Sequence, residues 1–502
     1  MAPPVVKIYD PNLSVMLYKT ISRKTLNGNN PTSQRFQGTS RMIDLTPFFG
    51  DGSSIRTSKS VREPAGGFAL TFGDQPYIGE YANQPAFESL YGLIEPMDYI
   101  EIRWRHNPST AAGAKPPIIM RGFVSTIARA EVMGSDGKPQ RAVSVNGQDY
   151  GKLWQMLQIL YLPGMVTGED VLSSFKFFER FGGALAILTS SQFVTQIMQQ
   201  VVNPFLAGFM PANSPCPSTI DATQYVSVGH GVCSIQGSQN QEGTIYDIMR
   251  TYGDVGTWNE LYIDDDEDGV HCVYRPIQAM DLNGDLIQPD APSPQYVDIS
   301  DVDVISINVA RSDANVANYY WVRAPRFDMA DALYQQQFAL QGAQANTVLL
   351  SSYPNCTETL YGLRPMTHDT QQGGDAVDTM SSGLLADAQG TRNTEMCNWI
   401  NNRRAIMVAM NQDNVLYESG SMRVRGNENI RAGMYVRLHR GTFVATYYVE
   451  KVDHDYMPFQ GVFSTLTVER GTGFIQRAQR SGGTDSPYLA EMMETPPLEQ
   501  QQ

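Results

Sequence analysis

Residues 116–149 read PPIIMRGFVSTIARAEVMGSDGKPQRAVSVNGQD, and this stretch decides the fold. Side chains alternate between two faces through residues 123–130 and again through 142–145, and the loop 134–137 between them contains Asp-Gly. Alternation with a period of two residues around such a loop predicts an antiparallel hairpin. A further strand is predicted just before it, at Tyr99–Arg105. Three antiparallel strands are therefore expected in succession.

A second passage near the C-terminus repeats this pattern. Strands are predicted over residues 435–438, 447–454 and 463–471, with a loop at 458–461 before the last of them. Each copy closes on polar residues and a glycine, Val-Asn-Gly in the first and Val-Glu-Arg-Gly in the second. Sequence identity between the copies is low, but the order strand, strand, loop, strand is the same. We therefore interpret the chain as carrying one β-module twice.

The composition bounds the architecture. A chain of 502 residues and 55.7 kDa is too long for a single core and is expected to form three or four domains. Its hydrophobic content of 42% suffices for well-packed domains, while charged residues make up only 18%, below the usual quarter. A surface with few charges fits a protein that works against partners.

The net charge argues against one class of function. Acidic residues outnumber basic residues by 52 to 37, which gives a net charge of −15 and an isoelectric point near 4.9. A groove that grips nucleic acid needs clustered Lys and Arg, so such a groove is not expected. The charge is compatible with an acidic surface past which nucleic acid moves without binding, and equally with an ordinary soluble acidic protein.

Cysteine usage and hydropathy indicate a soluble protein without a disulfide framework. The five cysteines are widely spaced and form no C-x-x-C pair, although a bond between Cys216 and Cys233 across a loop stays open. The N-terminus shows no apolar signal segment. The longest uncharged run, residues 181–220, contains Ser, Gln, Asn and Pro and is too polar for a membrane span.

The predicted fold class is mainly β, with two antiparallel β-barrels and α+β insertions. We expect a first barrel over residues 1–160, a helical and loop insertion over 161–240, a small α+β domain with a hairpin over 241–300, a second barrel with a helical insertion over 301–480, and a disordered tail over 481–502. Apolar residues at helical spacing predict helices near 153–160, 171–181, 193–202, 244–252, 330–345 and 394–410. Pro204 is expected to end the third of these helices. Residues 351–390 are expected to be irregular, and 488–493 to form a short helix on a partner.

The predicted hairpin near residue 265 has an acidic turn with the sequence Asp-Asp-Asp-Glu-Asp-Gly. Asp264, Asp266, Asp268 and Gly269 match positions one, three, five and six of a calcium-binding loop. Position twelve, where a bidentate Glu belongs, is Arg275, and strands rather than helices are predicted on both sides. A solvated hairpin turn is therefore the favoured interpretation, and a structural Ca²⁺ the alternative.

Catalytic motifs are missing from the sequence. The six histidines are scattered, and the chain has no H-E-x-x-H, no G-x-S-x-G, no Walker loop and no His/Cys cluster at zinc spacing. His454 lies in an alternating run and is interpreted as a barrel side chain rather than a base. We predict no catalytic residue, no cofactor and no metal site, although distant residues can converge into a triad that a sequence does not reveal.

Three passages of the sequence resemble a known family. Residues 116–145 are followed by Asn146-Gly147-Gln148-Asp149-Tyr150 and a predicted helix, and this passage resembles the "strand, S-G-x-D-Y, helix" passage of the tail hub proteins of contractile-tailed bacteriophages. Residues 304–318 resemble the start of that family's second barrel, and 447–471 its terminal strands. Asn146 replaces the family's small hydroxyl residue. Residues 165–240 and the tail after 480 have no counterpart.

The resemblance implies a structural protein of the virion and not an enzyme. Such hubs carry two barrels related to the tail-tube fold, so a homotrimer presents six barrels in a pseudo-sixfold ring between the sixfold tail tube and the threefold spike. The implied partners are a tail tube protein or tube-terminating ring, a central spike protein, a tape measure protein and baseplate wedge proteins. DNA would pass through the lumen without specific binding, and no membrane is involved. The implied location is the tail baseplate, assembled in the host cytoplasm.

Two other classes of function stay open. One is a receptor-binding tail protein, if the loop-rich residues 203–243 form a carbohydrate platform; that segment contains only one tyrosine, Tyr225, and no tryptophan. The other is a hub-linked peptidoglycan hydrolase, which needs a pair of acids or a His/Cys site on an extra domain. The hub half of type VI secretion spike proteins is similar, but this chain lacks a spike half, and we expect the spike to be a separate polypeptide.

Overall fold

The computed structural model describes residues 12–20, 41–80, 86–106, 115–133, 139–159, 189–210, 214–232, 243–323, 353–370, 372–373, 386–440 and 443–480. The helices expected at 171–181, 330–345 and 488–493, and the tail after 480, lie outside the described residues. Within them the fold is mainly β, as predicted. No helix of the described part is long and apolar enough to cross a membrane.

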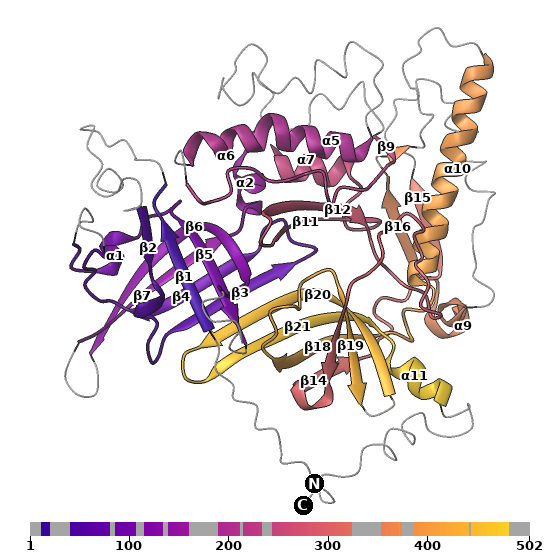
Figure 1. Cartoon of the computed structure of the whole chain (residues 1–502). Coiled ribbons are helices and arrows are strands. Elements are labelled where there is room, and N and C mark those ends of the chain that lie inside the picture. The colour runs from indigo at the N-terminus through magenta and orange to yellow at the C-terminus, as the bar shows by residue number, and fades with distance from the viewer. Residues whose placement is uncertain are drawn as a thin grey trace, which may run out of the picture.

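Thirteen of the described strands form one hydrogen-bonded sheet that curls into two barrels (Figure 1). The first barrel consists of β1 (Asn12–Tyr18), β2 (Met42–Asp44), β3 (Ser54–Ser60), β4 (Gly67–Gly73), β5 (Tyr99–Arg105), β6 (Ile118–Met133) and β7 (Pro139–Gln148). The second consists of β13 (Tyr296–Ser300), β14 (Val304–Ala310), β18 (Glu418–Arg425), β19 (Tyr435–Arg440), β20 (Phe443–Met457) and β21 (Gly461–Gly471). Short helices η3 (Thr46–Phe48), α1 (Leu90–Leu93) and η6 (Asp301–Asp303) connect strands at the barrel ends.

The two barrels have the same strand order, which confirms that one module occurs twice. The order in the first is β3-β4-β7-β6-β5-β1, and in the second it is β14-β18-β21-β20-β19-β13. One pairing differs between the copies, because β1 runs antiparallel to β5 whereas β13 runs parallel to β19. The predicted succession of strand, strand, loop and strand corresponds to β5–β6–β7 and β19–β20–β21.

The duplication extends to single residues. Tyr99 lies opposite Phe123 in the first copy, and Tyr435 lies opposite Tyr448 in the second. Counting from these pairs, the long strands of both copies have an irregularity in register at the same place, between Val124 and Thr126 and between Val449 and Lys451. Such bulges bend and twist a strand locally, so both copies bend at the same point.

A helix follows the last strand of each copy, α2 (Gly151–Met156) and α11 (Gly473–Arg480). The sequence Asn-Gly-Gln-Asp-Tyr makes this turn in the first copy. A Cβ on Gly147 would lie 2.1 Å from the Phe68 ring and 2.5 Å from the Phe123 carbonyl oxygen, so only glycine fits there. Asp149 then accepts a hydrogen bond from the Gly151 amide at 2.9 Å, which satisfies a free donor at the start of α2.

A layer that includes helices, short strands and the α+β hairpin covers the first barrel. It contains β8 (Gln158–Ile159), α5 (Ser190–Ile197), the π-helical segment η4 (Met198–Val202), α6 (Asn203–Phe209), β9 (Gly231–Val232), β10 (Gly243–Thr244), α7 (Ile245–Tyr252), β11 (Asn259–Asp265) and β12 (Val270–Pro276). The prediction for Pro204 was wrong, because it does not end the helix. It occupies the first turn of α6, where a missing amide costs little, directly after the π-helical segment.

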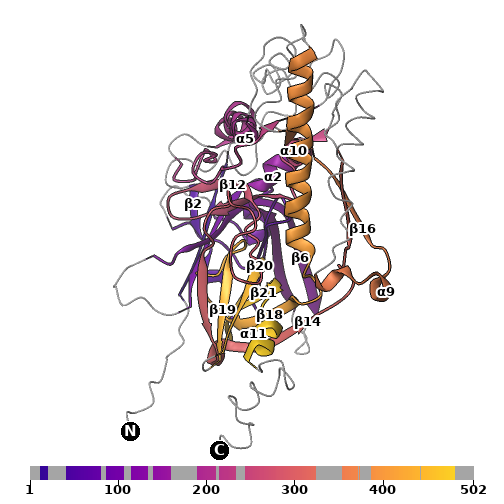
Figure 2. The same ribbon diagram turned by 90° about the vertical axis from the view of Figure 1, so that its right-hand side faces the viewer.

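A third group of elements packs beside the second barrel. It comprises β15 (Tyr319–Arg323), η7 (Pro354–Cys356), α9 (Glu358–Tyr361), β16 (Pro365–Asp369), β17 (Gln372–Gly373) and α10 (Ala386–Asn411). The expectation of irregular structure over 351–390 was therefore wrong in part, since β16 forms a parallel pair with β15. The long helix α10 begins at Ala386 rather than near 394 and extends beyond the barrels along one side of the molecule (Figure 2).

Candidate functional site

The two barrels join edge to edge within one chain. The first half of β20 pairs with β19 of its own barrel, and its second half runs on and pairs with β3 of the other barrel. The register of this joint runs from Lys451 opposite Ser60 to Tyr456 opposite Ile55. Main-chain hydrogen bonds thus connect the copies, and the four-strand unit β3-β4-β7-β6 continues the unit β14-β18-β21-β20 as one sheet of eight strands.

Side chains reinforce the joint on both faces of the sheet. On the core face the His454 ring packs against Trp104 of the first barrel with ring centroids 5.1 Å apart, and its Nδ1 lies 2.8 Å from Ser464 Oγ. On the other face, Arg56 Nε lies 2.5 Å from Asp455 Oδ1. This surface ion pair contributes at most about 1 kcal/mol, so the apolar face dominates the stability of the joint.

Burial lowers the pKa of His454 to about 4. A histidine whose folded pKa lies below its unfolded value destabilises the folded chain as the pH falls from the unfolded value toward the folded one. We expect stability to drop between about pH 6.5 and 4, and a His454→Gln variant to lose this part of the acid sensitivity. Urea unfolding at pH 7, 5.5 and 4.5 measures both chains. Equal slopes against pH in the two would contradict this assignment.

The acidic turn between β11 and β12 inserts between the barrels. Asp265 is fully buried, accepts a hydrogen bond from Lys59 Nζ at 2.8 Å and lies 3.2 Å from the Arg121 amide nitrogen. The Arg121 guanidinium donates to the carbonyl oxygens of Asp266 and Gly269 at 2.9 and 3.0 Å. The turn is therefore bound by basic residues of the first barrel.

The second barrel holds the same turn from the other side. Arg431 donates to Asp264 Oδ1 at 3.0 Å and also to the carbonyl oxygen of Asp265. The first barrel also contacts the tip of the turn, where Glu267 accepts hydrogen bonds from Arg103 at 3.0 Å and from the Ile118 amide at 3.0 Å. The expectation of a solvated turn was wrong for Asp265, which is buried against Lys59 and Arg121, whereas Glu267 and Asp268 at the tip are exposed. The part of the chain that the structure describes contains no group of three or more metal-ligating side chains.

Lys59 is shared by two buried carboxylates. Its Nζ lies 2.8 Å from Asp265 and 3.9 Å from Asp149, the aspartate two residues before α2. Burial raises the pKa of Asp149 to about 7, although Lys59 opposes this shift. One lysine on the joint strand β3 thus connects the acidic turn, the motif after β7 and the pairing with β20.

The second face of the eight-strand sheet is polar and made of small side chains. Along β3, β4 and β7 the buried apolar residues alternate with residues of the opposite face, and the same holds in the second barrel. The opposite-face residues, matched across the strands by register, are Ser54, Ser58, Ala69, Thr71, Ser144, Asn146, Thr126, Ala128, Ser306, Asn308, Ser421, Thr465 and Thr467. We call this set the open face. It also includes charged residues of the same strands and face, such as Arg56, Asp453 and Asp455.

Most charges on the open face have a partner of opposite sign. Besides the ion pair between Arg56 and Asp455, Lys451 Nζ lies 3.5 Å from Asp453. The Arg62 guanidinium forms an ion pair with Glu469 at 2.6 Å. Arg423 lies over the ring of Phe463, with 4.7 Å between the guanidinium carbon and the ring centroid. A surface of this kind presents hydroxyl and amide groups and little net charge. It can stay wetted without attracting a polyanion.

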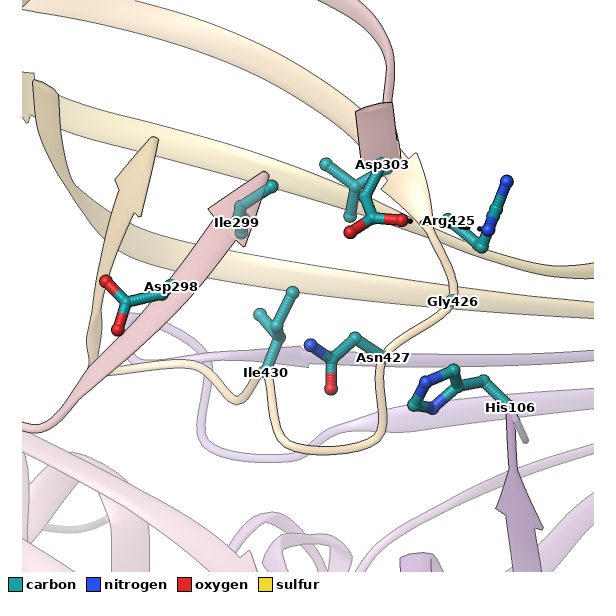
Figure 3. A pocket seen from close by; sticks show the side chains of 9 residues that line it. His106, Asp298, Ile299, Asp303, Arg425, Gly426, Asn427 and Ile430 are labelled. Carbon is teal, nitrogen blue, oxygen red and sulfur yellow. Dashed lines mark ion pairs between the residues drawn. The ribbon is translucent and has the colours of Figure 1, made fainter. Parts of the chain in front are cut away.

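The concave sites among the described residues differ in volume, and one of about 310 Å³ is lined by Met280, Tyr296, Tyr417, Tyr435 and Arg470. One cavity of about 70 Å³ opens where the end of β5 meets the second barrel, between His106 and the loop after β18 (Figure 3). His106 bonds there to Glu428, and Asp303 pairs with Arg425 at 3.7 Å. The His106–Glu428 contact connects the two barrels, while the Asp303–Arg425 pair lies within the second barrel. The cavity has room for a few water molecules only. Cys216, for which a disulfide stayed open, is a buried free thiol.

Comparisons with known proteins give structural neighbours only. No family model matches the sequence, and no curated protein matches it. Among solved structures, the chain is similar to the 43 kDa tail protein of prophage MuSo2 from Shewanella oneidensis, with 12% identity, a TM-score of 0.42 and coverage of 91% of this chain and 98% of that one. A tail protein from Neisseria meningitidis follows with 10% identity, a TM-score of 0.40 and coverage of 92% and 97%. An E. coli component of the type VI secretion system, described as structurally similar to bacteriophage T4 tail proteins gp27 and gp5, gives 8% identity, a TM-score of 0.33 and coverage of 83% and 73%.

Proposed function

We propose that this chain is a structural tail protein that forms a trimeric baseplate hub. The observation that carries the proposal is the joint between β20 and β3, which places two equivalent four-strand units side by side in one chain. A chain with two equivalent units supplies two positions of a sixfold pattern, and three copies supply six. A trimer of this kind has threefold symmetry in sequence and nearly sixfold symmetry in backbone, as an adapter between a sixfold tube and a threefold spike requires.

In this proposal the open face lines the channel of the ring. Small hydroxyl and amide side chains with paired charges offer neither clustered cations for phosphates nor a row of aromatic rings for bases. A hydrated polymer therefore moves past such a wall without specific binding. The tape measure protein would occupy this channel first, and DNA would follow during ejection.

The same proposal assigns the remaining properties of the chain. We propose no catalytic role, because the acids and histidines of the joint are engaged with lysine, arginine and serine side chains that hold the barrels together. Partners would be the tail tube or its terminating ring, a separate spike protein, the tape measure and the wedge proteins. The location would be the tail baseplate of a virion assembled in the host cytoplasm. The division at residues 160, 240, 300 and 480 stays a prediction.

Electron micrographs of the purified chain test this function. End views are expected to show a ring of six similar lobes around an open centre, with the insertions repeating three times at the periphery. The matched control is Arg431→Glu/Lys59→Glu, which reverses the charge of two basic partners of the acidic turn, one from each barrel, and should abolish the ring. Single particles without a ring, at high protein concentration and with neighbouring tail proteins added, would contradict the hub and favour a receptor-binding protein.

A further inference from the structure

The cavity of about 310 Å³ lies on the second barrel, at the face of β13, β19 and β20 that points away from the barrel core. Three tyrosines line it with a methionine and an arginine, and we call it the tyrosine hollow: Met280, Tyr296, Tyr417, Tyr435 and Arg470. Thr472 and Gln476, just before and within α11, line it as well; Figure 1 shows α11 beside the second barrel. Binding pockets commonly have volumes of about 300–1,000 Å³, so the hollow has room for the side chains of a bound segment.

The first barrel has matching rings, and there the chain covers them itself. The rings that lie opposite one another on three neighbouring strands are Tyr18, Tyr99 and Phe123 in the first barrel and Tyr296, Tyr435 and Tyr448 in the second. In the first barrel all three belong to a core that the insertion completes, among others with Phe209 and Cys216. In the second barrel the hairpin β11–β12 covers Tyr435 and Tyr448, whereas Tyr296 borders the hollow and is 39% exposed.

Arg470 brings a positive charge to the hollow that pairs with no carboxylate among the described residues. Its terminal nitrogens donate to the carbonyl oxygens of Met410, at 2.7 Å, and of Met280, and its guanidinium carbon lies 4.4 Å from the centroid of the Tyr417 ring. Its Nε is buried without a hydrogen-bond partner. Asp281 also lines the hollow, but its carboxylate accepts hydrogen bonds from amides of its own turn. The hollow therefore favours an apolar occupant that carries a carboxylate.

The sequence after α11 has a matching composition. Residues 487–494 read Pro-Tyr-Leu-Ala-Glu-Met-Met-Glu and combine large apolar side chains with two acids. The whole stretch 481–502 contains no Lys, Arg or His. These residues lie outside the described part of the chain, and their sequence alone provides the match: an aromatic ring and apolar side chains for the tyrosines, and carboxylates for the arginine.

The helix α11 holds the start of this stretch beside the hollow. Arg311, in the loop after β14, fixes the helix, since its guanidinium carbon lies 3.4 Å from the centroid of the Phe474 ring. Gln476, which lines the hollow, lies about one helical turn before the end of α11. Residues 481–488 span at most about 29 Å when extended, at about 3.6 Å per residue. Tyr488 is therefore within reach of the hollow.

We propose that residues 487–494 bind in the tyrosine hollow of their own chain, with the Tyr488 ring among the three tyrosines and a glutamate of the segment beside Arg470. The first barrel supplies a precedent, because an insertion of the same chain covers its matching rings. The bound segment connects α11 with the turn at 280–284 and covers Tyr296, the exposed ring of the three. This contact forms within one chain and is independent of the proposed trimer.

Photo-cross-linking in the full chain tests the contact, with a benzophenone amino acid in place of Tyr488. Mass spectrometry after illumination is expected to find cross-links from position 488 to residues 280–284 or to Tyr417. The same amino acid in place of Leu498, outside the proposed segment, should give these cross-links at least tenfold less often. A denaturing gel separates links within one chain, which keep the mass of one chain, from links between copies, which double it.

Two further variants address the hollow and the charge. Val444 is half-buried and lines the hollow, so Val444→Trp should fill it and reduce the cross-links at least tenfold. Thr71→Trp, at a half-buried position on the open face of the first barrel, is the matched control and should leave the cross-links unchanged. Glu491→Gln/Glu494→Gln alters only residues after the last described helix. It should speed up chymotrypsin cleavage after Tyr488 at least threefold, because it removes the charges that face the arginine.

Cross-links within one chain that reach the hollow and are lost in Val444→Trp support the contact. Cross-links that double the mass on the gel would make a second copy the occupant and overturn it. Cross-links elsewhere on the chain, or cross-links that persist in Val444→Trp, also overturn it. So does an absence of cross-links, which would leave the hollow to another ligand. If Val444→Trp fails to fold, the cleavage of Glu491→Gln/Glu494→Gln decides, and a rate equal to that of the unchanged chain overturns the contact.

Discussion

Lys59→Met is expected to destabilise the chain by about 3–5 kcal/mol near pH 8, because it leaves Asp265 and Asp149 buried without their shared cation. The loss should shrink near pH 5. Without the lysine the pKa of Asp149, which burial already raises, moves further above its unfolded value, and protonation at low pH then removes this buried charge. Urea unfolding at pH 8 and pH 5 measures both effects.

A second lysine offers the matched control. Lys152 is half-buried and donates to the Val124 carbonyl oxygen at 3.1 Å and to Ser125 Oγ at 3.0 Å, both neutral acceptors. Lys152→Met should cost about 1 kcal/mol at either pH. The double variant Lys59→Met/Asp265→Asn should recover part of the stability lost in Lys59→Met. A pH-independent loss no larger than that of Lys152→Met would show that the acidic turn does not depend on Lys59.

Trp104→Ala should have a comparable effect, about 3–5 kcal/mol, through the core rather than through charge. The Trp104 side chain is 1% exposed and packs in the core of the first barrel together with Val462 of the second. Its removal leaves a cavity at the joint and admits water to the His454 ring. The pKa of His454, which burial lowers to about 4, should therefore rise toward its unfolded value, as an NMR titration would record.

The control for this variant is a second buried tryptophan far from the joint. Trp154 lies in the core beneath the helical layer, with α5 and α7. Trp154→Ala should cost a similar amount of stability but leave the His454 titration unchanged. Hydrogen exchange should speed up in β3 and β20 for Trp104→Ala, and in α5 and α7 for Trp154→Ala. The same exchange pattern in both variants would mean that the joint is no separate unit.

The two barrels could be predicted from the sequence because alternation is a local signal. The hairpin β6–β7 and its repeat β20–β21 show a period of two that a single sequence carries plainly. The bulges at Ser125 and Glu450 could not be predicted in this way, since one extra residue in a strand leaves the pattern of polar and apolar residues readable on both sides. The hydrogen bond from the Gly151 amide to Asp149 could not be predicted either, although the motif around it was found.

The joint itself could not be predicted. The pairing of β20 with β3 connects residues about 400 positions apart, as in Arg56 with Asp455, and no local pattern encodes such a contact. For the same reason the sequence predicts a solvated acidic turn. The basic side chains that bind it, Lys59, Arg121 and Arg431, come from three distant segments. The sequence pattern of a run of acids is the same whether water or arginine faces it.

The mass of the purified chain in solution, measured by native mass spectrometry or light scattering, tests the central claim most directly. The account predicts a trimer, with a mass of three times 55.7 kDa. It also predicts that charges in place of two exposed apolar residues at the end of β6, Val132→Asp/Met133→Asp, reduce the mass to that of one copy while the fold is kept. A monomer or a dimer at every concentration, with neighbouring tail proteins present, would contradict the hub.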